Sequence, residues 1–344
     1  MAVIVIADDT NAYHGRSGEV MALGGTESSV IHLAEALAGN GHRVCVLTRT
    51  DRRLGHNGVE WGPLDDGRRL AGADLYLPVQ HPRLFGLVPR PRRLAVWLIW
   101  PVNNLRHYKR IPAMWRYRPV PVVASQWQAR EYSWVLPRRN PPIVIPLAVE
   151  DGWRGCEALP APPPPRAVYA SMPQRGLPWL LPVWQDLILP RVPGAEFHVL
   201  GLKAFARPFT DAVPDLPWTA NLNEAARASL RVYPGLPRDR QRDIMRGSRV
   251  YLYGGHRSEA FCLAAAEAQA LGVPAVVGTR TVLPERVRDG RTGFIRDDRQ
   301  GFADAAVRVL TDDALWARQH QASIAEQQGP SWTDVAAMFE RALL

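Results

Sequence analysis

Residues 258–274 read SEAFCLAAAEAQALGVP, an alanine-rich apolar segment that begins with Glu259 and has Glu267 near its middle. A glycine and a proline close the segment, and both residues are typical of helix ends. The pattern predicts a helix that starts near Ala260. Glu259 would then lie in the preceding loop and Glu267 inside the helix, so that both acids can face one cavity.

The first turn of this helix would present the backbone N–H groups of Phe261, Cys262 and Leu263. The first N–H groups of an α-helix have no internal acceptor, and they readily bind a phosphate or diphosphate. These residues therefore predict an anion site flanked by two hydrogen-bonding acids. A buried core helix, with Glu259 at its N-terminus and Glu267 on a solvent-exposed edge, explains the same residues equally well.

The flanking residues favour the ligand-binding interpretation. Gly254-Gly255 lie just before the stretch, and the apolar residues 273–278 just after it are typical of a buried parallel strand. Strand, loop, helix and strand form the unit that places ligands at the carboxyl ends of strands.

The composition is that of a globular protein large enough for two domains, with 47% hydrophobic and 22% charged residues. No apolar run reaches the roughly 18 residues of a membrane span, and residues 1–9 predict a first strand, not a signal peptide. Cys45, Cys156 and Cys262 are odd in number and far apart, so we expect neither a disulfide framework nor a zinc site. We expect a protein of the reducing cytoplasm.

The positive charge is concentrated in one segment. The chain has a net charge of +9. The segment from Arg83 to Arg139 contains twelve basic residues and one acid, Glu131, so its own net charge is +11. Five tryptophans lie in the same segment. Such a mixture suits an anionic membrane surface, a lipid-phosphate substrate or a nucleic acid. A generally arginine-rich surface is the alternative, because the chain has only two lysines, Lys109 and Lys203.

The N-terminal part alternates strands and helices. Residues 3–7 and 43–48 predict strands, and the intervening helix opens at Gly24-Gly25-Thr26-Glu27. A glycine pair at a helix N-terminus lets the backbone approach an anion closely. A plain tight turn explains the pair as well, because the G-x-G-x-x-G fingerprint is absent.

Further strands are predicted at 74–78, 94–100, 120–124 and 143–146, with a helix at 127–135, which completes one doubly wound domain. The strand at 74–78 leads to His81. A histidine at the carboxyl edge of a strand is placed for acid–base work or for contact with an acceptor hydroxyl, although a structural role is commoner.

The proline-rich residues 159–165 mark a domain boundary. After them the alternation restarts, with strands at 167–170, 196–200 and 250–253 and a helix at 176–189. Arg175 lies in the loop Ser171–Leu177, where its planar fork suits a diphosphate, with a surface ion pair as the alternative.

These motifs together resemble the GT4-like retaining glycosyltransferases of the GT-B fold, also called glycosyl transferases group 1. Glu259 and Glu267 match the E-x7-E motif of that family. The other matching motifs occur in the expected order over nearly the whole chain: Gly24–Glu27, Ser171–Leu177, Pro284-Glu285 and Asp289-Gly290-x-x-Gly293.

The resemblance implies two tandem Rossmann-like domains that face a central cleft. Residues 1–152 would form the acceptor-side domain, 153–165 the linker and 166–330 the nucleotide-sugar donor domain. The amphipathic helix at 331–344 would pack back on the first domain.

The resemblance also implies roles for single residues. Glu267 would bind the ribose of the donor and Glu259 its sugar, while Arg175 would neutralise the diphosphate. His81 matches the region where relatives have a histidine near the acceptor. The remaining donor contacts would come from the N–H groups of Phe261, Cys262 and Leu263 and from Gly24, Gly25 and Ser171.

Two features depart from the family pattern. Relatives have a second basic residue about five positions before the one matched by Arg175, where this chain has Ala170 and Ser171. Two alternatives stay open: Lys203 or Arg257 compensates for the missing residue, or the chain binds the diphosphate weakly. The usual Gly-Phe-Gly before the helix reads Ala260-Phe261-Cys262 here.

The implied function is transfer of a sugar from a nucleotide-diphosphate sugar, such as a UDP- or GDP-sugar, with retention at the anomeric carbon. The acceptor would be a saccharide, a cell-envelope polysaccharide or a lipid-linked compound. We expect no metal and no other cofactor, since the sequence has no Asp-x-Asp pair to chelate Mg²⁺ or Mn²⁺.

We expect a cytoplasmic enzyme with peripheral contact to the inner face of an anionic membrane through Arg83–Arg139, and no nucleic-acid partner. Two alternatives stay open. One is a GT-B nucleotide-sugar epimerase or hydrolase, and the other is a non-catalytic, basic nucleic-acid-binding protein.

Overall fold

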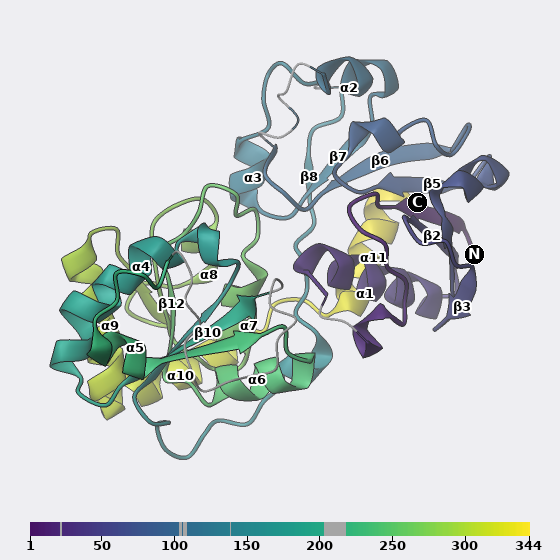
Figure 1. Cartoon of the computed structure of the whole chain (residues 1–344). Helices are drawn as coiled ribbons and strands as arrows, with labels where there is room; N and C mark the ends of the chain where they lie inside the picture. The colour runs from purple at the N-terminus through teal and green to yellow at the C-terminus, as the bar shows by residue number, and fades with distance from the viewer. Residues whose placement is uncertain (21–22, 103–104, 106–108, 138, 203–217) are drawn as a thin grey trace. The chain divides into compact units, whose positions relative to one another are not determined.

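The computed structural model describes residues 1–20, 23–102, 105, 109–137, 139–202 and 218–344 (Figure 1). The chain divides into two compact units. The first unit consists of Met1–Glu150 with Pro330–Leu344, and the second unit of Asp151–Gly329.

The first unit is built on an eight-stranded sheet in the order β3-β4-β2-β1-β5-β6-β7-β8. Every pairing in this sheet is parallel except that of β3 with β4, which form an antiparallel hairpin. The strands are β1 Val3–Ala7, β2 Arg43–Thr48, β3 Leu54–His56, β4 Val59–Pro63, β5 Leu75–Pro78, β6 Arg93–Leu98, β7 Val120–Val123 and β8 Ile143–Val144.

Helix α1 (Gly25–Gly39) connects β1 to β2, and α11 (Trp332–Leu343), from the end of the chain, lies beside it (Figure 1). Helix α11 also packs against the sheet, because Phe339 meets the buried Trp97 of β6 with ring centroids 5.5 Å apart. The C-terminal helix is therefore part of the core of the first unit.

Two short helices, α2 (Ile111–Tyr117) and α3 (Gln126–Arg130), flank β7. The predicted helix at 127–135 is too long, because α3 ends at Arg130 and the chain then turns. In this turn the N–H of Leu136 donates to the carbonyl of Ser133.

The second unit has a six-stranded, fully parallel sheet in the order β11-β10-β9-β12-β13-β14. The strand order reverses at β9 and β12, which are neighbours in space. The strands are β9 Arg166–Ala170, β10 Glu196–Leu202, β11 Leu230–Pro234, β12 Val250–Tyr253, β13 Ala275–Val277 and β14 Gly293–Ile295.

Helices cover this sheet, as an apolar parallel sheet requires. Pro182 interrupts the helix predicted at 176–189, which continues after α4 as a π-helical turn at Trp184–Ile188. The helices of the second unit are α4 Leu177–Val183, α5 Glu224–Ser229, α6 Arg238–Arg246, α7 Leu263–Ala270, α8 Leu283–Arg286, α9 Arg299–Thr311 and α10 Asp313–Glu326.

The proline-rich segment predicted as a linker is held against the second unit. The N–H of Leu159 donates to His320 Nε2 at 2.8 Å, and Arg154 donates to the carbonyls of Gln328 and Gly329. Throughout the described part of the chain, no helix is both long and apolar enough to cross a membrane.

Candidate functional site

The loops that follow β9 and β12 form the candidate site of the second unit. These two strands are adjacent, and ligands of doubly wound sheets bind where the strand order reverses, at the carboxyl ends of the strands. Residues 171–176 follow β9 and residues 254–262 follow β12. The sequence therefore brings two of its predicted motifs to one edge of the sheet.

Arg175 and Glu259 meet at this edge. Arg175 Nη1 lies 3.3 Å from Glu259 Oε1, which also accepts a hydrogen bond of 2.6 Å from the hydroxyl of Tyr253. The Glu259 side chain is 9% exposed and the Arg175 side chain 33% exposed. The carboxylate is thus fixed by two donors, while part of the guanidinium stays open to a ligand.

His256 belongs to the same loop, although its sequence pattern gave no signal for it. Its Nδ1 accepts from the N–H of Ser258, and its carbonyl accepts from the N–H of Glu259. Burial lowers the pKa of His256, and the positive charge of Arg175 lowers it further. The positive charge around His256 therefore comes from arginines, with Arg175 the strongest of them and Arg257 and Arg280 adding to it.

Helix α7 begins at Leu263, so the prediction that it starts near Ala260 is wrong. Cys262 immediately before it has a left-handed backbone with φ of 60°, which the composition does not reveal. Phe261 and Cys262 are buried loop residues, and Cys262 supplies the carbonyl that accepts from Ala265 and Ala266. The free N–H groups of the first turn are those of Leu263 and Ala264.

Glu267 projects from α7 and is bound by Arg238, the first residue of α6. Arg238 Nη2 lies 2.5 Å from Glu267 Oε1, and its guanidinium lies 4.2 Å above the ring centre of Trp153. The Glu267 side chain is 6% exposed and the Arg238 side chain 32% exposed. Arg238 was not predicted from the sequence, where its only signal is its place at the start of a charged helix.

The other predicted donor residues have separate environments. Ser171 is half-buried directly after β9, and Arg257 is exposed in a turn after β12. Lys203 lies outside the described residues. Of the arginines considered, Arg238 contacts one acid of the E-x7-E pair and Arg175 the other.

The first unit has its own polar cluster, at the carboxyl ends of the adjacent strands β1 and β5. Asp9 follows β1 and is buried, with its two oxygens in contact with His81 Nδ1 and Arg83 Nε. Burial alone would raise the pKa of Asp9, but hydrogen bonds from His81 and Arg83 lower it to about 2. Asp9 is therefore a carboxylate that orients His81.

Trp100 connects His81 to the N-terminus of α1. Its indole N–H donates to Thr26 Oγ1 at 3.1 Å, and its ring meets the His81 ring edge-on with centroids 5.7 Å apart. Gly24 and Gly25 open α1, as predicted, and Glu27 in its first turn is buried against Asn11. His81 and the glycine pair thus share one neighbourhood of the first unit.

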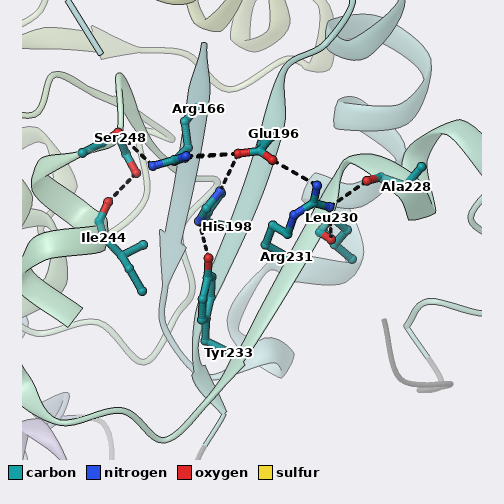
Figure 2. A network of polar contacts seen from close by, with 10 residues as sticks. Arg166, Glu196, His198, Ala228, Leu230, Arg231, Tyr233, Ile244 and Ser248 are labelled. Carbon is teal, nitrogen blue, oxygen red and sulfur yellow. Dashed lines mark hydrogen bonds and ion pairs between the residues drawn. The ribbon is translucent and has the colours of Figure 1, made fainter. Parts of the chain in front are cut away.

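A further network of charged residues occupies the other end of the second sheet (Figure 2). Glu196 accepts from Arg166, Arg231 and His198 at 3.2, 3.0 and 3.1 Å, and Tyr233 donates to His198 Nδ1 at 2.9 Å. Burial lowers the pKa of His198 to about 4 in spite of Glu196. Arg166 and Glu196 begin their strands, so the network ties three strands together away from the ligand edge.

Among the described residues, no group of three or more histidine, cysteine, aspartate or glutamate side chains is arranged to hold a metal ion.

Comparison with known proteins identifies the second unit. Residues 165–312 match the family model described as glycosyl transferases group 1. This segment is similar to the group 1 glycosyl transferases. The group 1 segment contains Arg175, Arg238, Glu259 and Glu267, and thus both arginine–glutamate pairs. The predicted family resemblance is confirmed.

Curated relatives support the same assignment over short stretches. The chain is 34% identical over 105 residues to a D-inositol 3-phosphate glycosyltransferase of Thermobifida fusca, and 38% identical over 113 residues to one of Streptomyces scabiei. These matches cover 30% and 31% of this chain but only 24% of each relative. The matched segment therefore spans about a quarter of the length of the group 1 relatives.

Solved structures match the whole chain at low identity. Sucrose-phosphate synthase from Thermosynechococcus elongatus covers 99% of this chain and 98% of its own, with a TM-score of 0.74 and 15% identity. Anabaena HepE in complex with UDP-glucose covers 100% of this chain and 99% of its own, with a TM-score of 0.75 and 16% identity. Together with the two parallel sheets, these matches show the predicted two-domain GT-B fold.

Proposed function

We propose that this protein is a retaining hexosyltransferase that moves a sugar from a nucleotide-diphosphate sugar to a hydroxyl acceptor without a metal ion. The observation that carries the proposal is the contact between Arg175 and Glu259 at the reversal point of the group 1 sheet. This contact joins a cation and a buried hydrogen-bond acceptor in loops of which one leads into α7, and such a combination supports binding of a sugar diphosphate.

In this proposal, each part of the nucleotide-sugar is bound by residues of the second unit. Arg175 and the N–H groups of Leu263 and Ala264 bind the diphosphate, Glu259 accepts from sugar hydroxyls, and Glu267 accepts from the ribose. Departure of the nucleoside diphosphate increases the negative charge on its terminal phosphate. Fixed positive groups stabilise that charge more in the transition state than in the ground state, which accelerates the reaction.

The chemical step is a displacement on one face of the sugar. The bond between the anomeric carbon and the phosphate oxygen breaks, the acceptor oxygen bonds to the same carbon, and the acceptor proton passes to the departing phosphate. The anomeric centre is oxocarbenium-like between these events. His81, oriented by Asp9, positions the acceptor hydroxyl in the first unit.

The names of the relatives support the donor and acceptor classes that we propose. HepE was crystallised with UDP-glucose, and the curated relatives are named for transfer to D-inositol 3-phosphate. We infer a UDP- or GDP-hexose donor and a saccharide or lipid-linked acceptor of the cell envelope, used at the cytoplasmic side of the membrane. Arg175 and the helix N-terminus supply the positive charge, so activity should survive chelation of divalent metals.

Donor binding is tested first by thermal shift with UDP-, GDP-, ADP- and TDP-sugars, because a ligand that binds the folded state raises the melting temperature. We expect one nucleotide class to raise it in the wild type and to fail with Glu267→Ala. A panel without any shift would overturn the donor assignment. An unchanged shift in Glu267→Ala would instead remove Glu267 from the donor site.

Turnover of the donor that binds then separates the enzyme classes. Transfer to an acceptor extract, with the product keeping the donor's anomeric configuration by NMR, is the expected result. Release of free sugar identifies a hydrolase, and a changed sugar on the intact nucleotide identifies an epimerase. Inversion in the product, or loss of transfer in EDTA, would contradict the mechanism proposed above.

A further inference from the structure

Two exposed tryptophans share one surface of the first unit, although they are far apart in sequence. Trp115 lies in α2 and is 48% exposed, and Trp134 lies between α3 and β8 and is 76% exposed. The indole N–H of Trp115 donates to the carbonyl of Val135, the neighbour of Trp134, at 2.9 Å. Tyr117, at 39% exposure, adds a third ring from the same helix.

Arginines surround these rings. Arg116 lies within 5.6 Å of the Tyr117 ring centre, and Arg118 ends the helix. Asn140 donates to the carbonyl of Arg118 at 3.2 Å, which brings the exposed Arg139 to the same place. We call this set the tryptophan–arginine surface: Trp115, Arg116, Tyr117, Arg118, Trp134 and Arg139.

The guanidinium groups of this surface keep their positive charge unneutralised, although Arg118 Nε donates to the backbone carbonyl of Trp115 at 3.3 Å. Considering only the residues that the structure describes, none of Arg116, Arg118 and Arg139 forms an ion pair with a carboxylate, whereas Arg53 and Arg288 elsewhere do. The sequence explains the difference, because Glu131 is the single acid between Arg83 and Arg139. Three unneutralised cations therefore lie beside three exposed aromatic rings.

The surface is attached to a rigid base. Met114, between the exposed residues of α2, is fully buried, and so is Leu136 next to Val135. Both belong to one apolar cluster with Phe85, whose ring lies 5.9 Å from that of Tyr117. The core thus holds α2 and residues 133–136 in place, while the two tryptophans extend beyond it.

We propose that the tryptophan–arginine surface docks the protein on an anionic lipid bilayer. Tryptophan and tyrosine partition to the level of lipid headgroups, and arginine binds lipid phosphates. The N–H of Trp115 is already bonded, so its ring can enter the headgroup layer without losing a hydrogen bond to water. This docking does not depend on the sugar-transfer reaction and would persist in a protein without that activity.

Co-sedimentation of the full chain with vesicles tests the proposal. We expect binding to phosphatidylcholine mixed with phosphatidylglycerol, little binding to phosphatidylcholine alone, and weaker binding at higher salt. The double variants Trp115→Ala/Trp134→Ala and Arg116→Glu/Arg118→Glu should each bind at least about tenfold more weakly, because the first removes the rings that enter the headgroup layer and the second reverses two charges that attract lipid phosphates.

Matched controls come from the same chain. Arg52→Glu/Arg68→Glu reverses the same number of exposed charges next to β2 and β4, at the opposite end of the sheet order, and Met172→Ala removes an exposed apolar side chain of the second unit. Both should bind as the wild type does. Equal loss in controls and surface variants would show that only net charge or hydrophobicity matters and would overturn the proposal.

A measurement on the unaltered protein guards against variants that fail to fold. Lipids brominated on their acyl chains should quench tryptophan fluorescence in anionic vesicles and not in neutral ones. Absence of quenching together with absence of co-sedimentation would overturn the proposal. So would tight, steeply salt-dependent binding to a single-stranded oligonucleotide without binding to vesicles, since this outcome identifies a nucleic-acid surface.

Discussion

Arg238 holds Glu267 through a contact of 2.5 Å, and the two residues come from the first turn of α6 and the interior of α7. The same guanidinium lies over the ring of Trp153, 4.2 Å from its centre. The carboxylate that we assign to the ribose is therefore oriented by a residue that precedes it in the chain by a helix and a strand.

Replacing Arg238 should weaken donor binding. We expect Arg238→Gln to raise KM for the donor about tenfold with a smaller change in kcat, because the variant removes ground-state orientation of Glu267. Arg238→Lys should recover part of the loss, since a single ammonium keeps the charge but not the stacked fork. Steady-state kinetics measure KM and kcat, and calorimetric titration with the nucleoside diphosphate measures binding directly.

The neighbouring Arg240 is the control for this experiment. It lies on the same helix but is exposed, so Arg240→Gln should leave KM unchanged. Equal effects of the two variants would mean that α6 contributes only general positive charge, and that Arg238 does not position Glu267.

Asp9→Asn should impair the acceptor side of the reaction. The amide carries no charge and cannot accept from both His81 and Arg83 as the carboxylate does, so His81 loses its fixed orientation. We expect kcat to fall by about tenfold or more, while donor affinity by calorimetry stays at the wild-type value. A matching loss in Asp65→Asn, an exposed aspartate of the same unit, would point to a nonspecific effect.

Two glycines of the Asp289–Gly293 motif should differ sharply in their tolerance of alanine. A Cβ at Gly293, where φ is +151°, would lie 1.9 Å from the carbonyl oxygen of Ala275 in the adjacent strand. We expect Gly293→Ala to lower the free energy of unfolding by about 4 kcal/mol or more. Gly290 has a φ of +74° with open space around it, so Gly290→Ala should cost about 1 kcal/mol. Urea unfolding of both variants provides the comparison.

The stability of the second unit should fall in acid because of His198. The pKa of His198 is about 4 in the folded protein, against 6.5 for a histidine exposed to water. Between pH 6.5 and pH 4, His198 therefore binds a proton in the unfolded chain and stays neutral in the folded chain. The neutral histidine stabilises the fold fully above pH 6.5, and this contribution is lost as the pH falls from 6.5 towards 4. The loss amounts to about 3 kcal/mol.

His198→Gln isolates this effect. Glutamine can donate to Glu196 and accept from Tyr233 but does not titrate in this range. Urea unfolding at pH 7, 5 and 4 can be followed by tryptophan fluorescence. The free energy of unfolding should fall less between pH 7 and pH 4 in the variant than in the wild type. Identical slopes would assign the acid sensitivity to other groups, such as His320, whose pKa is lowered chiefly by burial.

The sequence predicts the strands of this protein better than its loops. The bounds of β1 and β2 match their predicted residues, because β-branched apolar runs between polar residues have one stable arrangement in a parallel sheet. The hairpin of β3 and β4 was not predicted, since Leu54–His56 has little apolar character.

The candidate site was predictable where it depends on strand ends. Arg175 and Glu259 were placed at the edge of the second sheet because each follows a recognisable strand, and the structure brings them together. The start of α7 was not predictable, because a left-handed cysteine at position 262 is a backbone feature without a compositional signal. Arg238 was missed because β11, the strand before it, was not predicted.

The path of the chain divides the first unit between the two ends of the sequence. The second unit is one uninterrupted stretch, Asp151–Gly329, whereas the first unit needs α11 from beyond it. A ribosome therefore delivers every residue of the second unit before it delivers Phe339, the partner of Trp97. A chain truncated after residue 329 would keep the whole second unit but would leave Trp97 without its partner Phe339, so the truncation should damage the first unit and spare the second.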